Sequence, residues 1–248
     1  MKVIADLHNH SCLSPCASLE MSPRAMAARA KELGIGVLAL TDHNSALNCP
    51  ALADACAEAG IGFSPGIEVS SIEECHVVCL FPEVGAALEF GLAIERRLPR
   101  IAYDPEKMGD QVIVDVEDAV IGMVEHYLGM AVEMSLDEVA ALATGIGGIA
   151  IPAHIDRRMF SVKSQLGFLP DGPWPAVETT HLPPDGIDPR SYPLIMDSDA
   201  HYLEGMGRRN TVYEFEEDWN EPGGTGAFRA FRQALSRGAF DYRVIPSR

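Results

Sequence analysis

Several short apolar runs in this chain are each followed within three residues by Asp or His. The pairs of run and following residue are 3–5 with Asp6, 37–40 with Thr41-Asp42-His43, 149–151 with His154, and 194–196 with Asp199. Strands that are apolar throughout are typical of parallel sheets, which are covered on both faces. A (β/α) barrel places functional side chains at the carboxyl ends of many such strands. The pattern therefore favours an α/β barrel over an open doubly wound sheet, which gathers its ligands at one crevice.

Helices are expected between these strands. Ser22-Pro23 is typical of an N-cap followed by proline at the first helical position, and Gly34 marks the end of that helix. Further strands are predicted at 62–69, 76–81, 176–180, 211–215 and 242–245, and further helices at 51–59, 84–98, 136–143 and 227–236. Residues 105–129 are acidic and are expected to be helical in parts. We predict one domain over residues 1–248, with a helical insertion at about 84–145.

Composition limits the cellular location and the classes of binding partner that are expected for this chain. The 19 Lys and Arg residues against 36 Asp and Glu residues give a net charge of −17, which repels the phosphates of nucleic acids. A long nucleic acid is therefore not an expected partner. No apolar run reaches the roughly 18 residues of a membrane-spanning helix, and no membrane association is expected. The six cysteines, all in the first third, do not resemble a secreted disulfide scaffold, and the prediction is a cytoplasmic protein with free thiols.

Eight side chains near the predicted strand ends could bind metal ions. His8 and His10 share one side of an extended segment, and Glu68 lies inside an apolar strand, where an unpaired carboxylate is costly. The full set is His8, His10, His43, Glu68, His76, His154, Asp199 and His201. Nitrogen and oxygen donors without organised thiolates suit zinc, manganese or iron. Eight ligands exceed one tetrahedral site, so two or three divalent ions are expected, with a carboxylate such as Glu68 as a bridge.

These motifs resemble the PHP family, whose name joins polymerase-associated domains with histidinol phosphatase. The resemblance rests on Asp6-Leu7-His8-Asn9-His10-Ser11, Thr41-Asp42-His43-Asn44, the strand residue Glu68, and Ser198-Asp199-Ala200-His201. It implies a distorted (β/α)7 barrel that carries a di- or trinuclear metal site and hydrolyses phosphoesters. By resemblance, His8, His10, Glu68 and Asp199 hold the first metal. Glu68, His76 and His154 hold the second, and His43 and His201 hold the third.

The sequence departs from the family pattern at one position. An Asp or His often follows shortly after the His-x-His pair, whereas this chain has Ser14-Pro15-Cys16 there. Proline cannot bind a metal ion, so the third metal is short of a ligand. Cys16 could replace that ligand, a water molecule could complete the coordination, or the third metal could be absent.

The predicted activity is metal-dependent hydrolysis of a small phosphoester that resembles histidinol phosphate or a nucleotide. Arg157 and Arg158 are predicted to bind the substrate phosphate, Arg157 by resemblance to related phosphatases and because its planar, permanently charged fork suits two phosphate oxygens. His201 is a candidate proton donor. Asp6 and Asp42 are expected to orient metal ligands. An amidohydrolase-type enzyme and a non-catalytic metal-binding module are the alternatives. The oligomeric state is not predicted.

Overall fold

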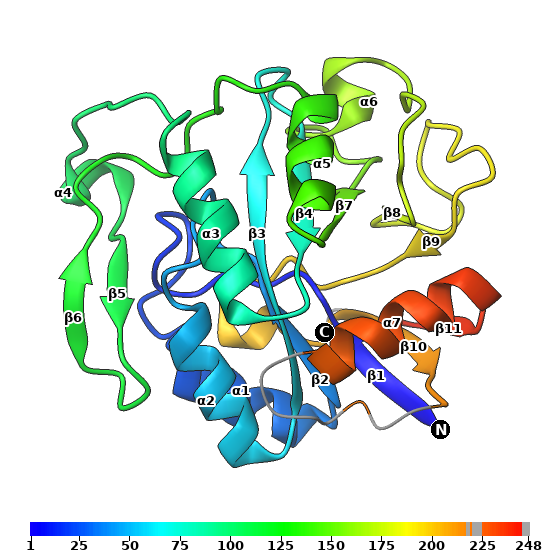
Figure 1. Cartoon of the computed structure of the whole chain (residues 1–248), viewed down its shortest axis with the longest axis horizontal. Helices are drawn as coiled ribbons and strands as arrows, with labels where there is room; N and C mark the ends of the chain where they lie inside the picture. The colour runs from blue at the N-terminus through cyan, green and yellow to red at the C-terminus, as the bar shows by residue number, and fades with distance from the viewer. Residues whose placement is uncertain (217–218, 220–224, 245–248) are drawn as a thin grey trace.

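The computed structural model describes residues 1–216, 219 and 225–244 (Figure 1). Its main feature is a curled sheet with the strand order β11-β10-β1-β2-β3-β4-β7. The strands are β1 (Lys2–Asp6), β2 (Val37–Leu40), β3 (Gly62–Ser70), β4 (His76–Leu80), β7 (Ile149–Pro152), β10 (Arg209–Glu214) and β11 (Phe240–Val244). Residue 245, the end of the last predicted strand, lies outside the described residues.

The sheet is mixed, which differs from the parallel sheet that the apolar strands suggest. β1, β2 and β3 are parallel to one another, but β4 is antiparallel to β3, and β10 is antiparallel to β1. The short turn between β3 and β4 explains the reversal, because a parallel pair needs a longer crossover. The reversal places His76, at the beginning of β4, opposite Ser70 at the end of β3. A residue at the start of a strand therefore reaches the same mouth as residues at strand ends.

Two further strands close the curl. β8 (Val177–Glu178) and β9 (Leu194–Ile195) form a parallel pair. The backbone N–H of Ile155, just after β7, donates to the carbonyl of Glu178 at 2.8 Å, and the N–H of Asp199, after β9, donates to the carbonyl of His8 at 2.9 Å. These contacts close a ring of strands in the order β1-β2-β3-β4-β7-β8-β9. β10 and β11 lie outside this ring. This arrangement confirms the predicted α/β barrel class, although only a few backbone hydrogen bonds join β7 to β8, and β9 to β1, through the residues that follow these strands.

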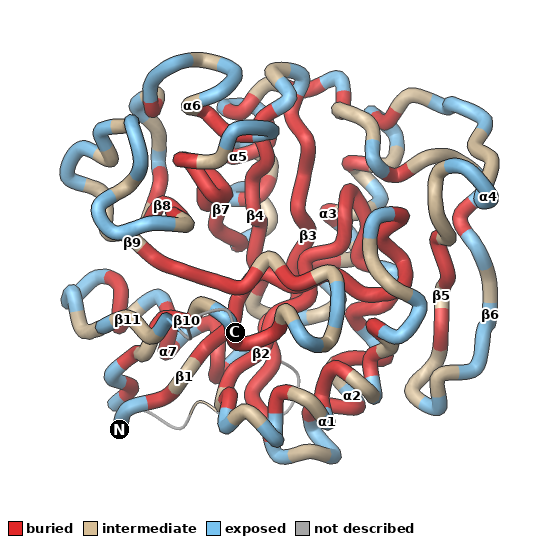
Figure 2. Tube along the Cα trace, turned by 180° about the vertical axis from the view of Figure 1, so that it is seen from behind, coloured by how far each residue is buried: buried red, intermediate tan, exposed pale blue. Residues whose placement is uncertain are grey.

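Two apolar cores flank the sheet. One packs α1 (Pro23–Leu33), α2 (Cys49–Ala59), α3 (Val84–Glu95) and α5 (Leu136–Gly145) against the outer face. The other joins the opposite face to α7 (Thr225–Arg237). Figure 2 shows β3, β4 and β7 as almost continuously buried. Ser22 caps α1 and Gly34 ends it with a φ of 71°, as predicted. Because strands β3, β4 and β7 are covered on both sides, their ends are held firmly at the barrel mouth.

The segment between β4 and β7 is not helical throughout. Between α3 and α5 it contains only the short α4 (Pro105–Met108), followed by a hairpin of β5 (Val112–Val114) and β6 (Val120–Met123). The prediction that residues 105–129 are helical in parts therefore holds for α4 alone, and the hairpin was not predicted. Val and Ile dominate both runs and favour strands, and Asp115 accepts the N–H groups of Glu117 and Ala119 in the turn. The remaining helices are α6 (Val162–Gln165) and the 3-10 helix η1 (Leu203–Gly205).

Candidate metal centre

Glu68 lies at the centre of a buried cluster of imidazoles at the barrel mouth. Its carboxylate is about 1% exposed, and a ring nitrogen of each of five histidines lies within 3.3 Å of one of its oxygens. The distances are 3.1 Å to His8 Nε2, 3.3 Å to His10 Nε2, 3.2 Å to His43 Nδ1, 2.8 Å to His76 Nδ1 and 3.2 Å to His154 Nε2. This convergence is the arrangement that a bridging carboxylate needs.

Asp199 and His201 complete the cluster from the loop after β9. Asp199 Oδ1 lies 3.3 Å from His10 Nε2 and 3.5 Å from His8 Nε2. The ring of His201 stacks on that of His10, with centroids 4.2 Å apart. The structure thus brings together all eight residues that the sequence predicts as ligands.

Seven of the eight residues fall into three overlapping sets of donor atoms, each compact enough for one ion, and His154 belongs to none of these sets. The first set contains His8, His10, Glu68 and Asp199, which is the predicted first metal site. The second contains His43, Glu68 and His76, so His43 occupies the place expected for His154. The third adds His10 to the expected His43 and His201. Cys16 belongs to none of these sets, which leaves the third set with three imidazoles as its protein donors. Which ion each residue binds stays a prediction.

Backbone conformation aims several of these side chains. His154 has a φ of 29° and Asp199 a φ of 51°, in the left-handed region that residues other than glycine seldom adopt. Asn44, next to His43, has a φ of 51°. Its amide nitrogen donates to the carbonyls of Leu128 and Met130, which ties the β2 loop to the insertion. Strained residues of this kind concentrate at functional sites, where the surrounding structure holds them in place.

Glu178 supports the centre and is not among the residues predicted from the sequence. Its Oε2 lies 2.8 Å from His8 Nδ1 and accepts the backbone N–H of His154 at 3.1 Å. Both the carboxylate and the ring are buried. A carboxylate on the far nitrogen fixes the tautomer of a ligating histidine and directs its other nitrogen at the metal. An acidic residue inside the predicted strand 176–180 was the available signal, the same one that identifies Glu68.

Asp42 acts on His10 through Ser14. The hydroxyl of Ser14 donates to Asp42 Oδ1 at 2.6 Å and lies 3.0 Å from His10 Nδ1. Asp42 also accepts the backbone N–H and the hydroxyl of Ser11. The buried carboxylate therefore holds the loop that presents His10, which is consistent with the orienting role predicted for Asp42.

Asp6 acts one step further from the centre. It accepts the N–H and the hydroxyl of Ser198 at 2.9 and 2.5 Å, and the N–H of Gly207 at 3.0 Å. Asp6 touches no imidazole through these bonds. It positions the loop that carries Asp199 and His201.

The charges in the cluster indicate a cation site. Burial alone disfavours the carboxylate of Glu68, yet the surrounding histidines hold its pKa well below the ordinary value. Burial lowers the pKa of His8, but Glu178 and Glu68 outweigh it and raise that pKa well above normal. Burial and the neighbouring His10 lower the pKa of His201 to about 4, which favours a neutral ring and counts against His201 as a protonated donor at neutral pH.

The donor atoms fit metal ions better than they fit one another. Nδ1 of His43 and Nδ1 of His76 are buried close to Glu68, but neither makes a hydrogen bond within the described structure. A buried polar atom without a partner costs about 1–3 kcal/mol. Ions between the carboxylate and these nitrogens would satisfy both at once.

The centre opens into a cavity of about 230 Å³. Arg157, Tyr127 and Phe160 line it together with the cluster residues. Arg157 forms an ion pair with Asp199, so this predicted phosphate-binding residue does reach the centre. Arg158 is exposed and does not line the cavity at the metal centre. Its predicted role in substrate binding stays a prediction without structural support.

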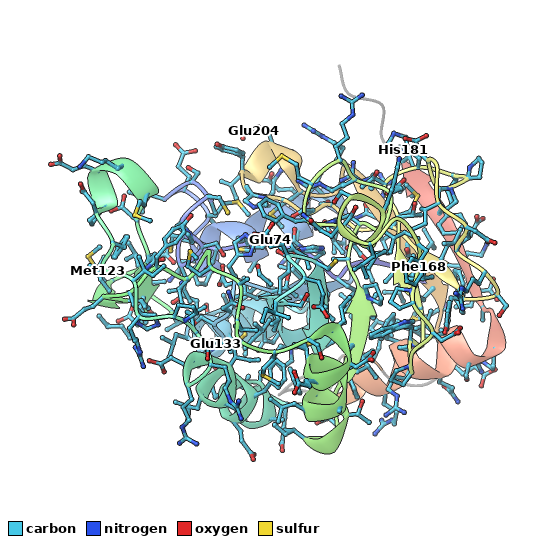
Figure 3. All side chains as sticks on the ribbon, turned by 90° about the horizontal axis from the view of Figure 1, so that it is seen from above. Glu74, Met123, Glu133, Phe168, His181 and Glu204 are labelled. Atoms are coloured by element: carbon cyan, nitrogen blue, oxygen red, sulfur yellow. The ribbon has the colours of Figure 1, made fainter. Side chains whose placement is uncertain are left out.

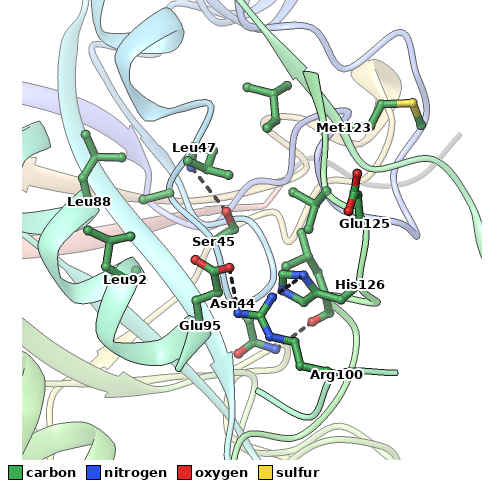
Figure 4. A pocket seen from close by; sticks show the side chains of 15 residues that line it. Asn44, Ser45, Leu47, Leu88, Leu92, Glu95, Arg100, Met123, Glu125 and His126 are labelled. Atoms are coloured by element: carbon green, nitrogen blue, oxygen red, sulfur yellow. Dashed lines mark hydrogen bonds and ion pairs between the residues drawn. The ribbon is translucent and has the colours of Figure 1, made fainter. Parts of the chain in front are cut away.

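A larger cavity of about 500 Å³ lies between α3 and the hairpin (Figure 4). At its polar end Arg100 contacts Glu95 and His126, and Asn44 lies beside them. Leu88, Leu92 and Met123 supply apolar walls. His126 therefore belongs to this cavity and to none of the metal sets. Figure 3 shows Met123 and His181 on opposite sides of the molecule, and His181 pairs with Asp156 instead of the centre.

The PHP domain family model matches residues 6–147, more than half of the chain. The chain belongs to this family, which confirms the predicted class of metal-dependent phosphoesterase and the metal-binding character of the cluster. No helix in the described part of the chain is long and apolar enough to cross a membrane.

Relatives and solved structures extend this finding. The chain is 33% identical over 78 residues to the 5'-3' exoribonuclease Rnm of Salmonella typhimurium, which covers 31% of this chain and 26% of that protein. It also resembles the lesion-specific endonuclease EndoQ of Pyrococcus furiosus, with a TM-score of 0.65, 18% identity, and coverage of 98% of this chain and 58% of that one. Endonuclease Q in complex with a 27-mer duplex gives a TM-score of 0.66 at 20% identity, over 98% and 58% of the two chains. The chain thus spans about a quarter of the curated relative and over half of the endonuclease.

These relatives overturn one expectation. The net charge of −17 predicts that long nucleic acids are not partners, yet an exoribonuclease and a DNA-bound endonuclease share this domain type or fold. The error lies in treating the net charge as if it were spread evenly over the protein surface. Local cations at the mouth, with metal ions added, set the potential that a phosphate meets.

Proposed function

We propose that this protein is a metal-dependent phosphodiesterase that hydrolyses nucleic acid strands. The observation that carries the proposal is the Glu68 cluster, which opens into a cavity that contains the guanidinium of Arg157. The similarity to Rnm supports a polynucleotide substrate. A cytoplasmic location belongs to the same proposal, because all six cysteines are free thiols.

Two or three zinc, manganese or iron ions would be held by the eight clustered residues, with Glu68 shared between ions. Such ions lower the pKa of water and neutralise charge on phosphoryl oxygens. The imidazoles fit this task because Glu178 and Ser14 hold the far nitrogens of His8 and His10 and leave the near nitrogens free to coordinate.

Arg157 would bind a non-bridging oxygen of the scissile phosphate. Its guanidinium is partly exposed and already lies against Asp199, so a phosphate that enters the cavity meets a cation held in place. A positioned arginine offers paired N–H donors that match phosphate oxygens. The neutral ring of His201 is suited to coordination and leaves proton donation to the leaving oxygen to water.

The decisive experiment measures metal content and substrate choice together. Purified protein is stripped with EDTA, reloaded with Mn²⁺ or Zn²⁺, and assayed on single-stranded RNA, single-stranded DNA, histidinol phosphate, a nucleoside monophosphate and bis(p-nitrophenyl) phosphate. We expect two or three equivalents of bound metal, loss of turnover in EDTA, and turnover of at least one polynucleotide. Glu68→Gln should lose both metal and activity, whereas Arg96→Ala, a charge change on the exposed end of α3, should lose neither.

Two results would overturn the proposal. Binding of less than one equivalent after reloading would remove the metal centre. Faster hydrolysis of a small monoester than of any polynucleotide would return the substrate to the class of small phosphoesters.

A further inference from the structure

A second cavity continues the one at the metal centre. It has a volume of about 450 Å³ and is lined by Tyr202, Glu204 and Arg208, among others. The two cavities share Cys16, Asp199 and His201 as lining residues. A substrate whose phosphate lies at the metal centre can therefore extend along η1 without leaving a concave surface.

Arg208 is a cation without a partner in this second cavity. Within residues 1–216, 219 and 225–244, its only hydrogen bond runs from its backbone N–H to the carbonyl of Gly205, and its side chain forms no ion pair. The neighbouring Arg209 differs, because its guanidinium donates to the carbonyls of Asp197 and Ser198. Arg209 supports the loop, whereas the guanidinium of Arg208 is available to an anion.

An exposed aromatic ring lines each of the two cavities. Tyr202 is 59% exposed in the second cavity, and Phe160 is 37% exposed in the first. Phe160 has a φ of 55°, and its ring stacks on His76 at 4.9 Å and 8°. One face of Phe160 is thus fixed against the metal cluster. Exposed aromatic rings that accompany a cation along a groove are typical of sites that bind unpaired nucleotides by stacking.

We propose that the joined cavities bind an unpaired nucleic acid strand across the metal centre. The scissile phosphate lies beside Arg157, an adjacent phosphate binds Arg208, and the flanking bases stack on Tyr202 and Phe160. The strand is unpaired in this proposal, because Tyr202 and Phe160 offer exposed rings on which only unpaired bases can stack, and because Glu68 and the imidazoles are buried. This inference rests on the proposed function and adds the path and form of its substrate.

Glu204 allows a second test of the proposed path, in which strand binding should become stronger and not weaker. Its carboxylate lines the same cavity as Arg208 and repels a phosphate there. Figure 3 shows Glu204 on η1 at the rim of the molecule, where it is exposed. Removal of this charge should strengthen the binding that removal of Arg208 weakens.

The test uses the metal-loaded enzyme and two substrates. One is the single-stranded oligonucleotide, RNA or DNA, that the enzyme hydrolyses. The other is bis(p-nitrophenyl) phosphate, a small diester that has no second phosphate for Arg208 to bind. For the oligonucleotide we expect Arg208→Ala and Tyr202→Ala each to raise KM roughly tenfold, and Glu204→Gln to lower it. For the small diester all three variants should match the wild type, as should the control Arg96→Ala on both substrates.

Salt dependence and strand form complete the test. Loss of one phosphate contact reduces the slope of log KM against log salt by about 0.7 for a single strand, and only Arg208→Ala should show this change. Fully paired blunt duplex should be cut much more slowly than the single strand. Equal KM values for the wild type and Arg208→Ala on the oligonucleotide, or preference for the duplex, would overturn the inference while leaving the proposed function intact. Absence of turnover on every polynucleotide would instead remove the proposed function.

Discussion

His8 and Glu178 are 170 residues apart in the chain, yet His8 Nδ1 and Glu178 Oε2 lie 2.8 Å apart in the buried interior of the barrel. The same oxygen accepts the backbone N–H of His154. One carboxylate on β8 thus connects the first and the fifth strand of the ring below the metal cluster. This contact depends on closure of the barrel, because β8 reaches β1 only when the curl is complete.

Glu178→Gln should lower metal affinity about tenfold, because His8 loses the anion that fixes its tautomer and raises its basicity. Competition with a chromogenic zinc chelator measures this affinity. Glu20→Gln, an exposed acidic residue far along the loop from β1, is the control and should match the wild type. Unchanged zinc affinity in a folded Glu178→Gln protein would contradict an orienting role for Glu178.

Ser14→Ala should lower both stability and metal affinity. The hydroxyl donates to Asp42 Oδ1, accepts the backbone N–H of His43 and lies within hydrogen-bond distance of His10 Nδ1. Its removal therefore leaves buried polar groups without a partner. Each such group costs about 1–3 kcal/mol. Urea unfolding of the metal-free protein gives the stability term separately from the metal titration. Ser236→Ala, on the exposed side of α7, controls for the loss of a serine hydroxyl. An effect on neither quantity would show that Asp42 reaches His10 by another route.

The sequence predicts the ligands better than it predicts their supports. His8, His43 and His154 follow apolar strands, and a local pattern is enough to find them. Glu178 carries only the signal of an acidic residue inside a predicted strand, and Ser14 carries none. Their contacts with His8 and His10 are found only when distant segments are placed side by side. Residue-level signals thus identify the residues of the metal cluster and name Asp6 and Asp42 as supports, but they miss Glu178 and Ser14.

The fold also divides into features that local sequence patterns predict and features that they do not. Strand and helix positions follow from local patterns, and the barrel class follows from where functional residues lie along them. The reversed direction of β4 was not predicted, although the short gap between the predicted strands 62–69 and 76–81 leaves no room for the crossover that a parallel pair needs. The hairpin of β5 and β6 was missed because acidic residues such as Asp115 and Asp118 in its turn suggested a solvated helix. Val112 and Val114 are in fact buried, against Cys12.

Asp156→Asn should destabilise the protein at neutral pH and much less in acid. Asp156 is buried and accepts the N–H groups of Thr180 and His181 and the hydroxyl of Thr180. Burial opposes its charge, but these donors hold its pKa below the ordinary value. A depressed folded-state pKa stabilises the protein above about pH 4 and loses this effect as pH falls through the folded-state pKa.

Urea unfolding at pH 7 should therefore show a loss of about 1–3 kcal/mol for Asp156→Asn. The difference from the wild type should shrink progressively as the pH is lowered toward 3. Asp54→Asn, an exposed change on α2, should show no such trend. A difference that stays constant with pH would mean that Asp156 acts through its shape and not through its charge.

The last prediction concerns Pro15 and Cys16, where the chain departs from its family. The third set of donors consists of His10, His43 and His201, and Cys16 is not part of it. Because His10 also belongs to the first set, an ion in the third set should be the weakest bound and the first lost on dialysis.

Cys16→Ser should leave metal content unchanged, since water rather than a thiolate completes this coordination. Pro15 lines the cavity beside His43, so Pro15→Asp should add a carboxylate ligand and raise occupancy at this position. Anomalous diffraction at the metal edge compares the three proteins directly. Full occupancy of the third position in the wild type, with no gain in Pro15→Asp, would show that proline leaves no deficit there.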